Sequence, residues 1–199
     1  SSPMGSVDYP FNPLSVALGA GCSFVARALD SDRKGLDETL TTAAHHRGTS
    51  FVEIYQNCPI FNDGAFDDYK GPEAAERIVR LVDGEPILLG ADRSKGVVRD
   101  PVNGSLTVTE VAQVGMDHVV VHDATRPDPS LAFELAHLHD SGQISQIPLG
   151  ILRSVSLPTY DDMVRDQLRL AGGSADDKPA RDAALQQLLR GNDTWQVHN

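Results

Sequence analysis

The chain has only two cysteines among its 199 residues, Cys22 and Cys58. Two cysteines cannot form the disulfide framework of a small secreted domain, so we expect a reducing compartment, namely the cytoplasm. They also cannot supply the four thiolates that an iron–sulfur cluster normally requires. Any cysteine-based site in this chain therefore needs further ligands from outside it.

Basic residues are also scarce, because 17 Lys and Arg face 28 Asp and Glu, which gives a formal net charge of -11. Nucleic acids and anionic membranes bind basic surfaces, so we expect neither as a partner. No apolar run approaches the ~20 residues that a membrane-spanning helix needs. The first residues have no signal-peptide pattern and resemble a mid-chain loop, so we expect a fragment of a longer protein.

Motifs of a self-contained active site are missing as well. The sequence has no G-x-S-x-G, Walker A or G-x-G-x-x-G pattern. The seven histidines lack the spacing of a zinc motif, and we interpret them as structural. Asp63, Asp67 and Asp68 lack the ligand spacing of an EF-hand, so we interpret them as a solvated loop.

The first part of the chain has the pattern of strand, helix and strand. Asn12-Pro13 predicts the start of a short helix. Residues 23–28 predict a strand, and the segment between Asp30 and Gly48 has helical spacing with caps at both ends. Residues 50–55 form an apolar run that predicts a buried strand. The crossover is long enough for parallel pairing, so we expect an α/β fold with a parallel sheet edge.

Beyond Gly71, turn and cap signals predict an added region of hairpins and helices. Turns at residues 83–85 and 100–104 predict two hairpins. The other elements that we expect are a strand at residues 118–121 and helices that begin after Asp128-Pro129, at Thr159 and near Ala180.

The most informative stretch is Gln56-Asn57-Cys58-Pro59-Ile60-Phe61-Asn62-Asp63, directly after the second strand. In open parallel sheets, ligands bind just beyond the carboxyl ends of the strands, so Cys58 is placed to face a ligand. The alternative is a small buried hydrophobic residue, as most free cysteines are. Position alone leaves both interpretations open. Cys22, next to Gly21 and the first strand, we interpret as a packing residue.

Long stretches of the chain resemble one protein family. They are Pro3-Met4-Gly5-Ser6 with Pro10-Phe11-Asn12-Pro13, Phe24 to Asp32, Phe51 to Gly64, Lys95 to Arg99, His122-Asp123, Asp128 to Phe133, Pro158 to Asp162 and Gly191 to Trp195. Together they resemble the β subunit of 2-oxoacid:ferredoxin oxidoreductases over nearly the whole chain. The stretch from Asn57 to Gly64 resembles the 2-oxoglutarate group more than the pyruvate group.

The resemblance implies a thiamine-diphosphate-binding fold and an enzyme with an α subunit, as a heterotetramer. It implies oxidative decarboxylation of a 2-oxoacid, with coenzyme A as acyl acceptor and ferredoxin as electron acceptor. The implied cofactors are thiamine diphosphate, Mg²⁺ and a 4Fe-4S cluster. Cys58 matches the fourth cluster cysteine of the family, whereas the other three and the residues that hold magnesium and diphosphate would precede Ser1. The loop Pro3, Met4, Gly5, Ser6 would lie on the active-site side, and no catalytic residue is assigned.

The resemblance also suggests a division of the chain. Residues 1–70 would be the C-terminal part of the thiamine-diphosphate-binding domain, residues 71–171 a family-specific region, and residues 172–199 a linker and docking tail. The tail carries Leu185, Leu188, Leu189 and Trp195, which we expect to dock on a surface. A different class of function is a non-catalytic assembly module that holds a partner subunit; an intact mass near 21.4 kDa would favour it.

Overall fold

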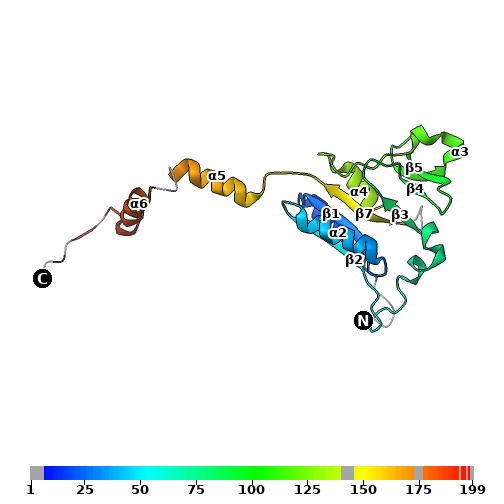
Figure 1. The fold of residues 1–199 in the computed structure, drawn as a ribbon, viewed down its shortest axis with the longest axis horizontal. Helices are drawn as coiled ribbons and strands as arrows, with labels where there is room; N and C mark the ends of the chain where they lie inside the picture. The colour runs from blue at the N-terminus through cyan, green and yellow to red at the C-terminus, as the bar shows by residue number, and fades with distance from the viewer. Residues whose placement is uncertain (1–6, 140–145, 173–176, 193, 196, 198–199) are drawn as a thin grey trace. The chain divides into compact units, whose positions relative to one another are not determined.

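The computed structural model describes residues 7–139, 146–172, 177–192, 194–195 and 197. Contacts divide the chain into two compact units, Ser1–Leu157 and Pro158–Asn199. The first unit holds two β-sheets with their covering helices, and the second holds two helices (Figure 1).

The larger sheet of the first unit has four strands in the order β2 (Ser50–Tyr55), β1 (Phe24–Leu29), β7 (Ile147–Ser154) and β3 (Ile78–Leu81). β1 and β2 pair in parallel from Phe24↔Ser50 to Leu29↔Tyr55, which confirms the predicted parallel edge. β7 pairs antiparallel with β1 and parallel with β3, so the sheet is mixed.

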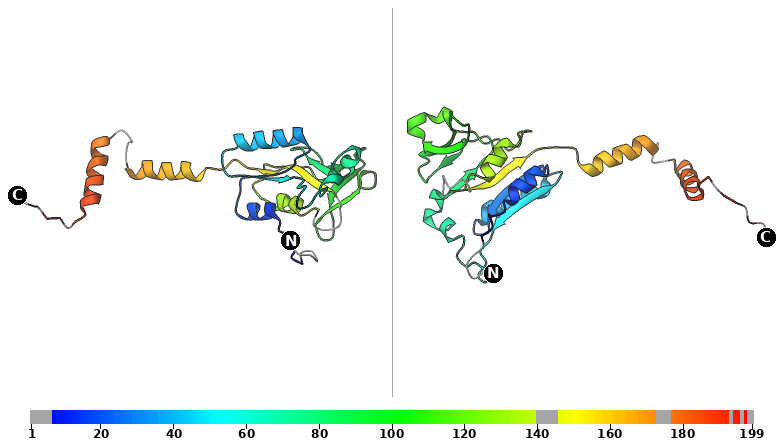
Figure 2. Two further views of the ribbon diagram at one scale, coloured as in Figure 1. Left: turned by 90° about the horizontal axis from the view of Figure 1, so that it is seen from below. Right: turned by 180° about the vertical axis from the view of Figure 1, so that it is seen from behind.

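Helices cover both faces of this sheet. α2 (Arg33–His45) lies on one face, and α1 (Pro13–Gly19) and α4 (Ser130–Ala136) lie on the other (Figure 2). All six residues of β1 are therefore buried. The predicted helix starts are confirmed, because the side chain of Asn12 accepts a hydrogen bond from the amide of Ser15 at 3.0 Å and that of Asp32 from Gly35 at 3.2 Å.

β2 is less buried than the sequence predicts. None of its residues is fully buried, and Ser50 and Ile54 are exposed. The reason is that β2 is the edge strand of the sheet and pairs only with β1 within the described residues. A run of apolar side chains indicates a strand but does not show how many neighbours that strand has.

Strand β7 was not predicted, because Pro148 and Gly150 are residues that usually interrupt strands. The register explains how both fit. β1 pairs with β7 only from Gly150 onward, so Pro148 has a strand neighbour only on the β3 side. Gly150 has φ 124°, and a Cβ there would meet the Leu81 carbonyl oxygen at 2.8 Å, so only glycine allows this close approach.

The smaller sheet contains β4 (Leu88–Leu89), β5 (Lys95–Arg99) and β6 (Leu106–Glu110), followed by α3 (Val111–Val114) and the 3-10 turn η3 (Met116–His118). β5 and β6 form an antiparallel pair, which confirms the predicted hairpin at residues 100–104. The hairpin predicted at residues 83–85 is wrong, because β3 joins the large sheet and β4 the small one. This turn instead carries the chain from one sheet to the other.

Residues 118–121 do not form the predicted strand. His118 ends η3, and Val119 and Val121 make only isolated bridges, to Val98 and Pro86. The segment divides its hydrogen bonds between two partners, since the amide of Val120 donates to Val97 and that of His122 to Glu85. A regular ladder therefore never develops.

His122 links this segment to the large sheet and should make stability depend on pH. Its side chain is 1% exposed, and its Nε2 lies 2.7 Å from the carbonyl oxygen of Ile151. Burial lowers the pKa of His122, although that carbonyl and Asp83 and Asp123 oppose the shift. Below its ordinary pKa of about 6.5, the unfolded chain therefore binds a proton that the folded chain does not.

The free energy of unfolding is thus expected to fall as the pH drops from 7.5 to 5.5. The contribution of this one group is at most about 1.4 kcal/mol per pH unit. His122→Gln, whose amide nitrogen can still donate to Ile151, should give a flatter pH profile. Urea titrations at several pH values measure both, and parallel profiles for the two proteins would contradict the prediction.

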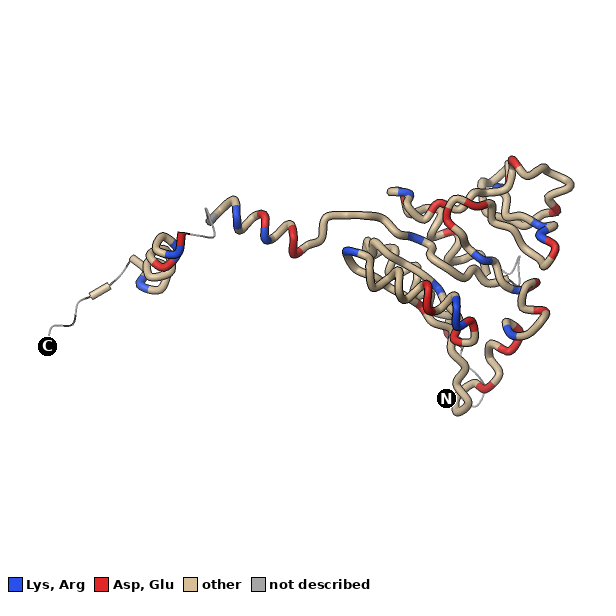
Figure 3. Tube along the Cα trace, viewed as in Figure 1, with Lys and Arg blue, Asp and Glu red and all other residues tan. Residues whose placement is uncertain are grey.

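Two 3-10 turns, η1 (Asp67–Tyr69) and η2 (Pro72–Glu76), connect β2 to β3. Acidic and basic residues are interspersed along the described part of the trace (Figure 3). No helix among the described residues is long and apolar enough to cross a membrane.

The second unit consists of α5 (Tyr160–Gly172) and α6 (Lys178–Arg190). The predicted helix start at Thr159 is confirmed, because its hydroxyl accepts a hydrogen bond from the amide of Asp162 at 3.2 Å. Gly172 belongs to α5 rather than to the predicted linker, and residues 173–176 lie outside the described residues. α6 has no buried residue, and Trp195 is 84% exposed. Docking of this tail on a surface stays a prediction, as does the division at residues 70 and 171.

Candidate functional site

The carboxyl ends of β1 and β2 lie side by side, and the segment with Cys58 begins there. The parallel register ends at the pair Leu29↔Tyr55. One residue beyond this pair, the amide of Asp30 donates to the carbonyl of Tyr55 at 3.0 Å. This is the edge of a parallel pair at which ligands usually bind.

A set of hydrogen bonds closes the loop from Asn57 to Gly64, which we name the Cys58 loop. The amide side chain of Asn57 donates to Asp63 and accepts from the amide of Gly64, both at 2.9 Å. The amide of Asn62 donates to the carbonyl of Cys58 at 2.9 Å. Gly64 has φ 78°, a left-handed conformation that favours glycine. The start and the end of the loop are therefore tied together.

Asp30 ties the Cys58 loop to the sheet. Its Oδ2 accepts a hydrogen bond from the amide of Asn57 at 3.1 Å, across from β1 to the residue before Cys58. Asp30 thus contacts the end of β2 through its main chain and the beginning of the loop through its side chain.

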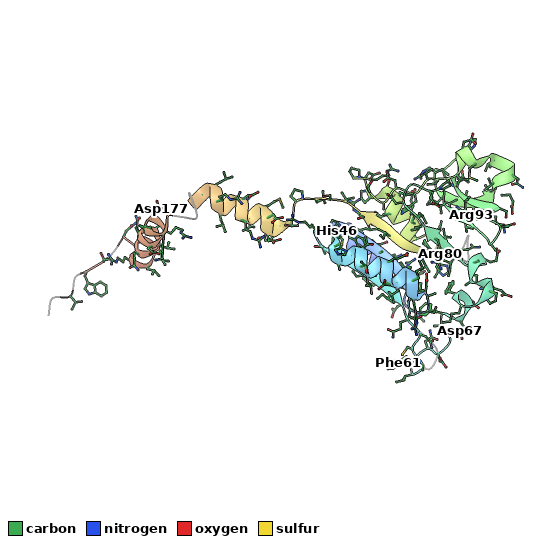
Figure 4. All side chains as sticks on the ribbon, in the orientation of Figure 1. His46, Phe61, Asp67, Arg80, Arg93 and Asp177 are labelled. Atoms are coloured by element: carbon green, nitrogen blue, oxygen red, sulfur yellow. The ribbon has the colours of Figure 1, made fainter. Side chains whose placement is uncertain are left out.

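The two cysteines lie in different environments. Cys22 is buried, and its Sγ lies 3.1 Å from the carbonyl oxygens of both Phe24 and Thr49, which confirms its packing role. Cys58 is a free thiol of intermediate exposure. Three residues beyond Cys58 in the same loop, Phe61 is 87% exposed and projects away from the sheet (Figure 4). The position of Cys58 at the strand ends and its partial exposure suit a metal ligand better than a core residue.

Within the described residues, no three His, Cys, Asp or Glu side chains are grouped so that they could hold a metal ion. Cys58 can therefore supply one ligand but not a complete site from this part of the chain. The acidic side chains near it pair with neighbours, Asp67 with Lys70 and Asp68 with Arg77, each at 3.1 Å. They form the solvated loop that the sequence predicted.

A buried ion pair lies on the face of the sheet next to this edge, and the sequence analysis did not find it. Nε of Arg27 is 2.6 Å from Glu53, and these side chains are 3% and 15% exposed. The guanidinium of Arg27 also lies over the ring of Tyr55, 5.0 Å from its centroid, while its Nη1 is buried without a hydrogen-bond partner. The sequence did offer a signal for this pair: the fourth residue of β1 is basic and the fourth residue of β2 is acidic, and parallel pairing places them side by side.

The ion pair borders a cavity of about 360 Å³ that is lined by residues 10–13, Arg27, Glu53, Tyr55 and His139.

The predicted active-site-side loop, Pro3 to Ser6, lies outside the described residues. Two histidines contact serine hydroxyls: Nε2 of His46 lies 2.8 Å from the hydroxyl oxygen of Ser23, and Nε2 of His137 lies 2.7 Å from that of Ser15.

Comparison with known proteins gives a consistent result, although no protein-family model matches the chain. The chain is 50% identical over 197 residues to the 2-oxoglutarate oxidoreductase subunit KorB of Mycobacterium tuberculosis, which covers 99% of this chain and 51% of that protein. It is also 35% identical over 63 residues to the 2-oxoacid:ferredoxin oxidoreductase subunit beta of Saccharolobus solfataricus. This match covers 32% of this chain and 21% of that protein.

A solved structure shares the fold. The 2-oxoglutarate:ferredoxin oxidoreductase from Magnetococcus marinus, with 2-oxoglutarate, coenzyme A and succinyl-CoA bound, superposes with a TM-score of 0.57 at 23% identity. The match covers 92% of this chain and 47% of that one. The chain thus spans about half the length of the first relatives that it matches.

These findings define the class of protein that the chain resembles: it is similar to a 2-oxoglutarate oxidoreductase subunit over 99% of its length, and to a β subunit of a 2-oxoacid:ferredoxin oxidoreductase over 63 residues. Within that class, the relative that matches almost the entire chain is of the 2-oxoglutarate type. The resemblance inferred from the sequence motifs is confirmed.

Proposed function

We propose that this chain is the C-terminal portion of the β subunit of a 2-oxoglutarate:ferredoxin oxidoreductase. The complete enzyme would decarboxylate a 2-oxoacid oxidatively, transfer the acyl group to coenzyme A and pass two electrons to ferredoxin. The single observation that carries this proposal is 50% identity over 99% of the chain to a 2-oxoglutarate oxidoreductase subunit. An α subunit and a cytoplasmic, reducing location belong to the same proposal.

The proposed cofactors are thiamine diphosphate with Mg²⁺ and a 4Fe-4S cluster. Thiamine diphosphate supplies the electron sink for decarboxylation, and the cluster carries electrons towards ferredoxin. The described residues fit one part of this set: a free, partly exposed thiol on a loop held at the ends of two parallel strands. Cys58 would give one thiolate, and the other ligands would come from outside this chain, because its other cysteine, Cys22, is buried.

The loop Pro3, Met4, Gly5, Ser6 is proposed to lie on the active-site side of the complete subunit. The motif resemblance alone supports this assignment, because the four residues lie outside the described part of the chain. We assign no residue of this chain to the chemistry at the carbonyl carbon of the substrate.

Steady-state rates of the complete enzyme test the proposed substrate. The full-length β subunit, assembled with its α subunit, is expected to reduce ferredoxin fastest with 2-oxoglutarate and only when coenzyme A is present. Pyruvate and branched-chain 2-oxoacids are the competing substrates. A preference for pyruvate would overturn the 2-oxoglutarate assignment, and an assembled complex that turns over none of them would favour the non-catalytic assembly module.

A further inference from the structure

Asp30 has an unusual set of contacts for a residue that simply follows a strand. Its amide donates to Tyr55, and its Oδ2 accepts from the amide of Asn57. Both contacts fix the chain that leads out of β2, on either side of Gln56. The main chain is therefore held at two points just before Cys58.

The contact to Asn57 extends into the Cys58 loop. While the main-chain amide of Asn57 is bound by Asp30, its side chain binds Asp63 and Gly64 at the far end of the loop. Asn57 thus connects the sheet to both ends of the segment that carries the thiol. Only Asn57 stands between Asp30 and Cys58, so loss of the Asp30 carboxylate should release the main chain next to the thiol.

The other carboxylate oxygen of Asp30 differs from the first. Its Oδ1 is buried and has no hydrogen-bond partner within the described part of the chain. Burying an unpaired oxygen of a carboxylate is costly. An asparagine at this position could keep an oxygen towards the amide of Asn57 and would lose no hydrogen bond of Oδ1 to the described residues.

We propose that Asp30 is a positioning residue, which holds the Cys58 loop so that the thiol is preset for a metal cluster before the cluster binds. The inference rests on the proposed function, in which Cys58 is a cluster ligand. The main alternative is that Asp30 only stabilises the fold, without influence on the thiol. The two ideas differ in what happens at Cys58 when the fold is intact.

The test compares Asp30→Ala with Asp30→Asn in the complete α–β complex. In the first arm, iron is removed with a chelator, and the alkylation rate of Cys58 by iodoacetamide is followed by peptide mass spectrometry. Asp30→Ala is expected to raise this rate roughly tenfold, the ratio to which loss of one hydrogen bond to a charged group corresponds. Asp30→Asn should alkylate like wild type, and the buried Cys22 is an internal measure of intact folding.

In the second arm, the cluster is loaded and its electron paramagnetic resonance spectrum and midpoint potential are measured. Asp30→Ala is expected to change both, and Asp30→Asn to restore them. If Asp30→Ala does not assemble, Asp30→Ser replaces it, because it also removes the carboxylate that accepts the hydrogen bond of the Asn57 amide.

An Asp30→Ala complex that matches wild type in both arms would overturn the proposal, as would an Asp30→Asn complex as impaired as Asp30→Ala. The alkylation arm does not need the cluster. If Cys58 proves not to be a cluster ligand, the first arm still decides whether Asp30 positions the thiol, so the two failures are distinguishable.

Discussion

Replacing Cys58 by alanine in the complete enzyme is expected to abolish the proposed 4Fe-4S cluster. A cluster of this type is held by four thiolates, and the methyl group of alanine cannot bind iron. The iron content should fall, and the visible and paramagnetic spectra of the cluster should be lost or altered. Electron transfer to ferredoxin should drop by more than the 10–100-fold that changes outside the ligand set typically cost.

Cys22→Ala is the matched control for this experiment. It removes the other thiol of the chain, which is buried in the hydrophobic core with its Sγ 3.1 Å from two main-chain carbonyl oxygens. Its expected effect is a modest loss of stability with the cluster intact. If Cys58→Ala keeps the wild-type iron content and cluster spectrum, the ligand role of Cys58 is wrong.

Glu53→Gln is expected to cause a large loss of stability. It leaves the guanidinium of Arg27 buried without its counter-charge, since the two side chains are only 3% and 15% exposed. Breaking a buried ion pair in this way typically costs about 3–5 kcal/mol. Urea titration at pH 7 measures the free energy of unfolding.

The double variant Arg27→Met with Glu53→Leu should be more stable than Glu53→Gln alone, because it removes both charges and keeps the volume apolar. The exposed pair Lys34–Glu38, at 3.8 Å, offers the control. Glu38→Gln should change the free energy of unfolding by less than about 1 kcal/mol. Equal effects of Glu53→Gln and Glu38→Gln would show that the buried pair has no special weight.

Much of the local structure could be predicted, because its signals lie close together in the sequence. Asn12, Asp32 and Thr159 each cap a helix through a main-chain amide three residues ahead. The strands at residues 23–28 and 50–55 and the helix between them follow from hydrophobic spacing and caps. The position of Cys58 beyond a parallel strand follows from the same pattern, so the sequence located the candidate ligand.

Long-range pairing could not be predicted. The turn at residues 83–85 has the composition of a hairpin, but the partner of β3 is β7, about seventy positions further along the chain. Pro148 and Gly150 hide β7 from sequence analysis, and only the register of its two neighbours shows why they are tolerated. The contacts of Arg27 with Glu53 and of Asp30 with Asn57 likewise depend on the pairing of β1 with β2.

By itself, therefore, the sequence determined the helix caps, the parallel strand pair, the acidic character and the family to which the chain is related. Only the tertiary structure decided which strands share a sheet, that Arg27 is buried beside Glu53, and that Asp30 holds the Cys58 loop. The physical reason is distance along the chain. Caps and periodicity act within one or two turns, whereas these contacts join residues 26 or more positions apart, which only folding brings together.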